Sequence, residues 1–106
     1  MATVFVNAIS RAVGTTEVVV FTAPEKSIVI GGSISNLIST TIPFTLKIRR
    51  GIEDTFIHKD KRVDAGDPYE LSKGNKLVLA AGDKLVISAK VDSSIDAVFS
   101  ILQGVS

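Results

Sequence analysis

The stretch that decides the fold class is Leu77-Val78-Leu79-Ala80-Ala81-Gly82-Asp83-Lys84-Leu85-Val86-Ile87-Ser88-Ala89-Lys90. In it, two apolar runs flank a short connection at residues 80–83. Gly82 can take a positive φ without steric cost, and Asp83 can accept hydrogen bonds from its own local backbone. The connection is therefore predicted to be a structural turn built on Gly82 and Asp83.

The run that follows this turn alternates with a period of two. One face carries only apolar side chains, at Leu85, Ile87, Ala89 and Val91. The opposite face carries Val86, Ser88 and Lys90 and is expected to be wet. The whole stretch at 77–90 is thus interpreted as two β-strands that pair with each other across the turn.

The rest of the chain repeats this layout of short apolar runs and turn signals. Strands are expected at residues 3–13, 17–22, 27–37, 42–49, 52–63, 69–71 and 95–105, besides the pair at 77–90. The run at 17–22 is apolar on both faces and is expected to be central or sandwiched. No run keeps a 3.6-residue apolar period. The chain is predicted to be all-β: a single β-sandwich domain (jelly-roll or Ig-like), residues 1–106, of about seven to nine short, mainly antiparallel strands.

Composition narrows the classes of function. The chain has 106 residues and a net charge of +1, with 12 Lys+Arg against 11 Asp+Glu. Such a balance predicts no general attraction to nucleic acid or to a membrane surface. There is no cysteine, which excludes disulfides and thiolate metal sites. Residues 1–7 contain no basic segment before a cleavable apolar core, so no signal peptide is expected and synthesis in a cytoplasm is predicted.

Residues capable of chemistry are scattered. His58 is the only histidine and is interpreted as an exposed strand or loop residue beside Lys59. Asp60, Asp64 and Asp67 are close enough in sequence for a weak hard-cation site, but they lack calcium-loop spacing and are favoured as solvated turn formers. Asp83 and Asp92 are interpreted in the same way. No catalytic, cofactor-binding or metal residue is assigned, and no enzyme activity is expected.

Two basic clusters occur in the central part of the chain: Lys47, Arg49 and Arg50, then Lys59, Lys61 and Arg62. With Phe44 and Phe56 nearby, a single-strand nucleic-acid surface is one alternative, in which aromatic rings stack on bases. However, Phe44 belongs to the apolar face of its strand, and acidic residues follow closely. A wet strand face with cross-strand ion pairs is the favoured interpretation.

Three residues are candidates for an interaction edge. Gly31 and Gly32 lie inside an apolar run, which indicates a bulge, a bend or the close approach of another backbone. Pro43 lacks a backbone donor, so it indicates an edge strand or the first residues of a strand. Apolar strands with such signals and few nearby charges are surfaces that another subunit can cover.

The order of these features resembles a class of small β-sandwich proteins encoded in the structural gene clusters of tailed bacteriophages. The similarity rests on Phe44-Thr45-Leu46-Lys47-Ile48-Arg49-Arg50-Gly51, the charged excursion at 58–60, the turn stretch at 77–85 and the last strand at 97–102. In the first half, Val19-Val20-Phe21-Thr22-Ala23-Pro24, Ile28-Val29-Ile30 and Ser33-Ile34-Ser35-Asn36 match in layout.

This resemblance implies a virion component, expected to be a capsid decoration (cement) protein that binds capsid subunits. Its partners would be other virion proteins, with the chain as a homo-oligomer in the particle and with no cofactor, nucleic acid or membrane. The alternatives are a neck, tail or fibre accessory protein, or a carbohydrate- or receptor-binding module. Sugar platforms usually expose Trp or Tyr, and this chain has only Tyr69 and no Trp.

Overall fold

The computed structural model describes residues 4–66, 68–71 and 77–104, and these contain strands but no helix. The strands are β1 (Val4–Val13), β2 (Val18–Thr22), β3 (Ser27–Asn36), β4 (Ile42–Arg50), β5 (Glu53–Val63), β6 (Tyr69–Leu71), β7 (Leu77–Leu79), β8 (Lys84–Ala89) and β9 (Ile95–Gln103). Their positions agree closely with those expected from the sequence. The charged run expected over 52–63 is β5, which forms a hairpin with β4.

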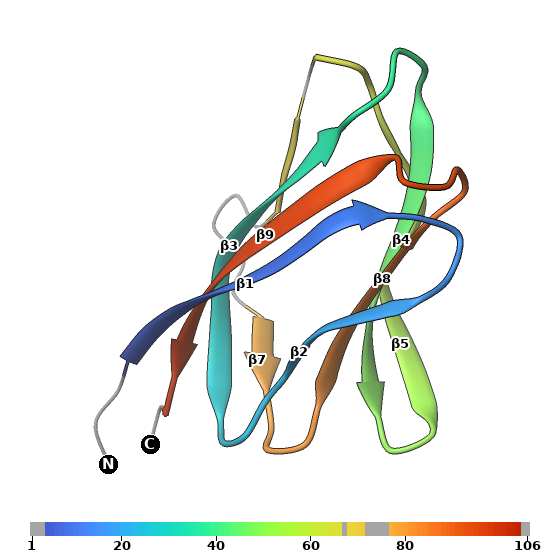
Figure 1. Ribbon diagram of the computed structural model, residues 1–106. Helices are drawn as coiled ribbons and strands as arrows, with labels where there is room; N and C mark the ends of the chain where they lie inside the picture. The colour runs from blue at the N-terminus through green and yellow to red at the C-terminus, as the bar shows by residue number, and fades with distance from the viewer. Residues whose placement is uncertain (1–3, 67, 72–76, 105–106) are drawn as a thin grey trace.

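The strands form two antiparallel sheets that pack face to face (Figure 1). The first sheet, called sheet A here, has the order β1-β9-β3-β6, with β7 also paired to β3. The second, sheet B, has the order β2-β8-β4-β5. Strands β6 and β7 pair with different parts of β3 and so occupy one position in the sheet. The predicted all-β sandwich is confirmed.

The strand order distinguishes the two predicted variants of the sandwich. In an Ig-like fold several strands pair with their neighbours in sequence. Among the strands described here, only β4 and β5 do so. The chain otherwise passes back and forth between the sheets, and β1 pairs with β9 while β2 pairs with β8. This is the jelly-roll arrangement.

The turn at Gly82 and Asp83 joins the two sheets. Strand β7 before it pairs with β3 in sheet A, and β8 after it pairs with β2 and β4 in sheet B. The predicted pairing of these two runs with each other is therefore wrong. Local sequence specifies a tight turn, but it does not determine whether the flanking strands hydrogen-bond to each other or turn a corner between layers.

The turn itself forms as expected. The Asp83 amide donates to the Ala80 carbonyl at 3.0 Å, and Gly82 has a φ of 91°. A positive φ at the third residue is the signature of a type II turn. Backbone hydrogen bonds also hold the turn to the end of β2. The Ala23 amide donates to the Asp83 carbonyl at 2.8 Å, and the Gly82 amide donates to the Ala23 carbonyl at 2.7 Å.

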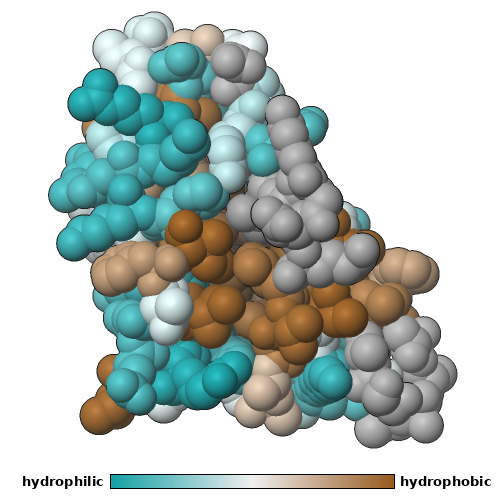
Figure 2. Space-filling view, turned by 180° about the vertical axis from the view of Figure 1, so that it is seen from behind, coloured by the Kyte–Doolittle hydropathy of each residue, from teal (hydrophilic) through white to brown (hydrophobic). Residues whose placement is uncertain are grey.

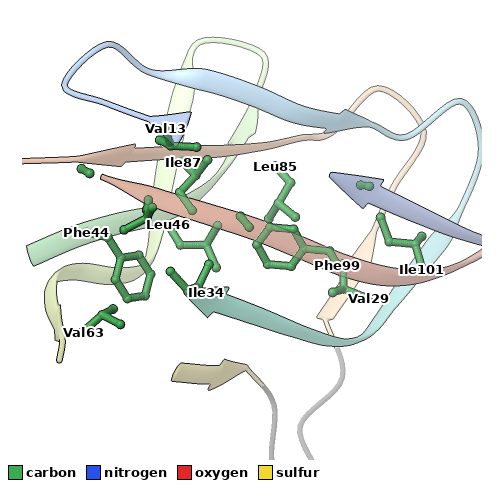
Figure 3. Packing of buried hydrophobic residues seen from close by; sticks show 14 of the residues in the cluster. Val13, Val29, Ile34, Phe44, Leu46, Val63, Leu85, Ile87, Phe99 and Ile101 are labelled. Atoms are coloured by element: carbon green, nitrogen blue, oxygen red, sulfur yellow. The ribbon is translucent and has the colours of Figure 1, made fainter. Parts of the chain in front are cut away.

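The core lies between the inner faces of the two sheets. Figure 3 shows Phe44 and Leu46 of sheet B and Phe99 of sheet A among the side chains that fill this space, and all three are fully buried. Complete burial of a Leu, Ile or Phe side chain contributes roughly 1.5–3 kcal/mol. The alternation in β4 and β9 therefore supplies several of the side chains whose burial stabilises the sandwich.

Two expectations about exposure are wrong. Strand β2 is an edge strand of sheet B rather than a central strand, and Val19 is exposed on its outer side. Val86, expected on the wet face of β8, is completely buried. It lies directly between Val19 and Lys47 in the sheet, and the Lys47 side chain is only 12% exposed because ion pairs hold it against the strand face.

Candidate interaction surface

The outer face of sheet A exposes a set of apolar side chains. Phe5, Ile9, Val78 and Val98 are all substantially exposed there, and the Phe5 side chain is the most exposed of them at 76%. Buried residues adjoin three of them in sequence, Ala8 beside Ile9, Leu79 beside Val78 and Phe99 beside Val98, so strand alternation directs these side chains outward. Figure 2, which views the molecule from behind relative to Figure 1, shows a further hydrophobic area in the middle of that view, between hydrophilic regions above and below it.

Strand register arranges these side chains in rows. Phe5 pairs with Leu102, Leu102 with Ile28, and Ile28 with Val78, so one apolar row crosses four strands. Ile9 pairs with Val98 in a second row. Between the two rows lie Asn7, Ser100 and Gly31, which pair in the same way. We call these nine residues the neutral face, because none of them carries a charge: Phe5, Asn7, Ile9, Ile28, Gly31, Val78, Val98, Ser100 and Leu102.

The neutral face is hollowed beside Phe5. The hollow has a volume of about 230 Å³ and is lined by Phe5, Val6, Asn7, Ile30, Ser100 and Ile101. Ile30 is the extra residue of a bulge, at which the β3–β9 register shifts between Val29 and Gly31. Pockets for small-molecule ligands usually enclose about 300–1,000 Å³. The hollow is therefore suited to a single inserted side chain rather than to a substrate.

The outer face of sheet B is charged instead of apolar. Lys47 Nζ lies 2.5 Å from a Glu17 carboxylate oxygen and 2.9 Å from one of Asp54. Arg49 bonds the same two acids, at 3.0 Å to Glu17 and 2.7 Å to Asp54. The predicted cross-strand ion pairs are confirmed for both basic residues.

These contacts shift the titration of the four groups. The hydrogen bond and charge of the Lys47 ammonium, and after them the charge and hydrogen bond of the Arg49 guanidinium, hold the pKa of Glu17 below its usual range. The pKa of Asp54 is lowered mainly by the hydrogen bond from Arg49 and then by that from Lys47. The ammonium groups of Lys47 and Lys59 also lie 5.6 and 5.2 Å from the centre of the Phe56 ring. The positive charges of this strand face are thus matched by acids of the same chain.

Asp83 has a second role that its position in a turn did not predict. Its carboxylate accepts hydrogen bonds from Arg50 Nε at 2.8 Å, from Arg50 Nη2 at 2.6 Å and from the Ala80 amide at 2.9 Å. The hydrogen bond from Arg50 is the main reason that the pKa of Asp83 is lowered. The predicted turn residue is also an anchor for the end of β4. The partners are 33 positions apart in sequence, so no local pattern signals the pair.

His58 connects the two sheets and is not the freely exposed residue that was expected. Its Nε2 lies 2.5 Å from the Tyr69 hydroxyl, so a residue of β5 in sheet B is bonded to one of β6 in sheet A. Phe44 packs on both rings, with centroids 6.0 Å from His58 and 5.7 Å from Tyr69. Burial, with the charge of Lys61 as a smaller cause, lowers the pKa of His58.

The loop acids do not converge. Asp60 lies 3.7 Å from the ammonium of Lys90, and Asp64 accepts a hydrogen bond from the Thr41 hydroxyl at 2.8 Å. Asp67 lies outside the described residues. In the described part of the chain, no three potential ligands are grouped closely enough to hold a metal ion.

Asp92 lies in a turn, as its position indicated, but its carboxylate bonds a distant segment of the chain. It accepts hydrogen bonds from the Thr15 hydroxyl at 2.9 Å and from the Thr15 amide at 3.2 Å. These bonds tie the β8–β9 connection to the β1–β2 connection.

The three candidates for an interaction edge lie elsewhere than predicted. Gly31 and Gly32 belong to β3, which has neighbours on both sides, and Pro43 belongs to β4, which lies between β8 and β5. None of the three is at a sheet edge. The bulge beside Gly31 is present, and Gly32 is closely approached both by the Phe99 ring and by the backbone carbonyl of Val98. Pro43 is the second residue of its strand, which agrees with the alternative expectation that it marks the first residues of a strand.

Comparison with known proteins gives no relative. No protein family, no curated protein and no solved structure matches this chain. Over the described ranges, no helix has the length and apolar character needed to cross a bilayer.

Proposed function

We propose that this chain is a non-enzymatic structural component of a tailed-phage particle, made in the host cytoplasm and incorporated into the virion. The specific role proposed is that of a capsid decoration protein, which stabilises the head by binding capsid subunits. The phage setting comes from the resemblance in the order of strands and turns. The observation that carries a role in assembly is the neutral face, an exposed apolar surface that another protein chain can cover.

An exposed apolar surface of this kind favours a protein partner. Soluble proteins rarely leave apolar side chains gathered on one sheet face unless another protein covers them. On the neutral face, Phe5, Leu102, Ile28 and Val78 form an unbroken row across four strands. The row is held rigidly, because each of its strands also contributes to the core. A rigid surface binds with little loss of conformational entropy.

The two alternatives have less support. A neck, tail or fibre position would use the same surface, so the sandwich itself does not favour the head over these sites. For a carbohydrate-binding module, Tyr69 would have to offer its ring to a sugar. That ring is packed against Phe44 and His58, and Lys61 Nζ lies 5.4 Å from its centre.

The test uses particles from the genome that encodes the chain, with its gene deleted. Purified chain should bind these particles saturably in cosedimentation, and cryo-EM should show symmetric density on the head that is missing without the chain. Binding confined to necks or tails would overturn the decoration role. No binding to heads, necks or tails would overturn the whole proposal.

A further inference from the structure

We propose that the neutral face is a homodimer interface, in which Phe5 of each copy inserts into the hollow of the other copy across a two-fold axis. The inference deepens the proposed function, on which its setting in a particle rests, by naming the partner of this surface as a second copy of the same chain.

Charge is the first argument for a second copy. All nine residues of the neutral face are uncharged. The charged Glu70 and Asp96 lie at its margin, beyond Ser33 and Val98, whereas the outer face of sheet B carries Glu17, Lys47, Arg49 and Asp54 across its strands. A partner with charged groups at the contact would have to bury them without counterions, which is costly. A second neutral face brings no charge. A two-fold axis places such a face opposite the first, because each copy uses the same patch.

Shape is the second argument. Phe5 is 76% exposed and stands at the rim of a hollow of about 230 Å³ that it lines together with Asn7, Ile30 and Ser100. The projecting ring and the hollow therefore belong to one patch. In a two-fold contact, each patch can offer its ring to the opposite hollow while receiving the other ring. Aromatic side chains seated in pockets supply much of the affinity of protein interfaces.

The polar members of the patch fit the same arrangement. The Asn7 amide and the Ser100 hydroxyl lie between the two apolar rows and line the hollow. Interfaces between proteins combine apolar centres with a limited number of hydrogen bonds. Asn7 and Ser100 can provide such bonds around an inserted ring and fix the relative orientation of the two copies.

Sedimentation velocity over a range of concentrations tests the inference. The wild-type chain should show a concentration-dependent dimer, and Phe5→Asp should weaken dimerisation at least about tenfold. Ile52→Asp is the matched control, because Ile52 is 99% exposed at the β4–β5 hairpin and lies away from the neutral face. The control should dimerise like the wild type, and thermal melting should show that both variants are folded. A monomeric wild type, or a dimer unaffected by Phe5→Asp, would overturn the inference.

Cross-linking supplies an independent readout because the chain has no cysteine of its own. Asn7→Cys should form a covalent dimer with a short thiol cross-linker, since the two copies of this residue meet near the axis. Phe56→Cys, which is exposed on sheet B, should not. Cross-linking of Phe56→Cys but not of Asn7→Cys would place the contact on the other sheet and contradict the inference.

The two proposals fail separately. A chain that is monomeric but still binds heads would overturn the dimer interface and leave the decoration role standing. A chain that dimerises through Phe5 but binds no particle would overturn the decoration role alone.

Discussion

The Asp83 carboxylate and the Arg50 guanidinium form a two-pronged ion pair, with contacts of 2.8 and 2.6 Å. The two partners are in different surroundings: the Asp83 side chain is 2% exposed, and that of Arg50 is 68% exposed. Arg50 therefore covers a charge that the corner between the sheets places out of reach of water. Because Asp83 also accepts the Ala80 amide, one carboxylate holds both the turn and the end of β4.

Loss of Arg50 should destabilise the fold. Arg50→Met leaves Asp83 with the Ala80 amide as its remaining described partner, and an under-satisfied buried acceptor costs about 1–3 kcal/mol. Urea denaturation should show a lower midpoint with an unchanged slope. Arg62→Met is the control, because Arg62 is an exposed cation of β5 and its loss should change stability by less than about 0.5 kcal/mol. Equal effects in the two variants would contradict the role of Arg50.

The fold should lose stability in acid. The pKa values of Glu17, Asp54, Asp83 and Asp92 are all lowered in the folded chain. Their contribution is complete above the unfolded pKa values of about 4 and is lost as the pH falls through the folded values, because the unfolded chain then binds more protons. Thermal melting from pH 6 to pH 2.5 should show this decrease. The melting temperature of Asp83→Asn should fall less over the same pH range. An equal fall in this variant would argue against Asp83 as a contributor.

A second, smaller loss of stability should begin nearer neutrality. The pKa of His58 is lowered on folding, so above the unfolded value of about 6.5 the residue is neutral in both states. As the pH falls below that value, the unfolded chain takes up the proton first, and stability decreases until the folded pKa is reached. Melting temperatures at pH 7.5 and pH 5 should differ in the wild type. The difference in melting temperature should be smaller in His58→Gln. If it is the same size in this variant, groups other than His58 cause it.

Gly32 and Gly31 should respond oppositely to the same substitution. A Cβ at Gly32 would lie 2.6 Å from Cδ1 of the Phe99 ring, whereas a Cβ at Gly31 would meet no atom within 4 Å. Gly32→Ala must displace a buried ring and should cost about 1–3 kcal/mol. Gly31→Ala should be neutral or slightly stabilising by about 0.4–1 kcal/mol, since it restricts the unfolded chain. Chemical denaturation of the pair checks this, and a tolerated Gly32→Ala would show that Phe99 can move.

Gly82→Val should harm folding through the backbone alone. A Cβ at Gly82 meets no atom within 4 Å, but the φ of 91° is one that a β-branched residue resists. The expected loss is about 1–3 kcal/mol, measured by thermal or urea unfolding. Ala81→Val, at the preceding exposed position of the turn, is the control and should be nearly neutral. A Gly82→Val chain with normal melting that no longer bound particles would show that the turn belongs to the binding surface.

Local patterns were sufficient to predict the strands and the turn, because they depend on neighbouring residues. The alternation of Ile42, Phe44 and Leu46 follows directly from the two faces of β4. The pairing of the strands, in contrast, could not be predicted from local patterns. The runs on either side of Gly82 look like a hairpin, yet each is bound to strands far away in sequence, and only the packing of the whole chain decides between these outcomes.

The candidate surface was hidden for the same reason. Phe5, Leu102, Ile28 and Val78 form one row only after β1, β9, β3 and β7 are placed side by side. The burial of Val86 depends on a lysine stem held by two acids, which no period of two can indicate. Gly31 and Gly32 did mark an unusual place in the chain, but its cause is a bulge and an aromatic ring rather than an open edge.

The position of β9 has a consequence for how the protein is made. This strand lies between β1 and β3, so neither of them has that neighbour until residues 95–103 have left the ribosome. Sheet A cannot close until β9 is available, and its earlier apolar strands must wait for it in the nascent chain. Folds that depend on such distant pairings form slowly. The step most exposed to aggregation is therefore the interval between synthesis of β3 and release of β9, which makes that interval the point at which a chaperone would help most.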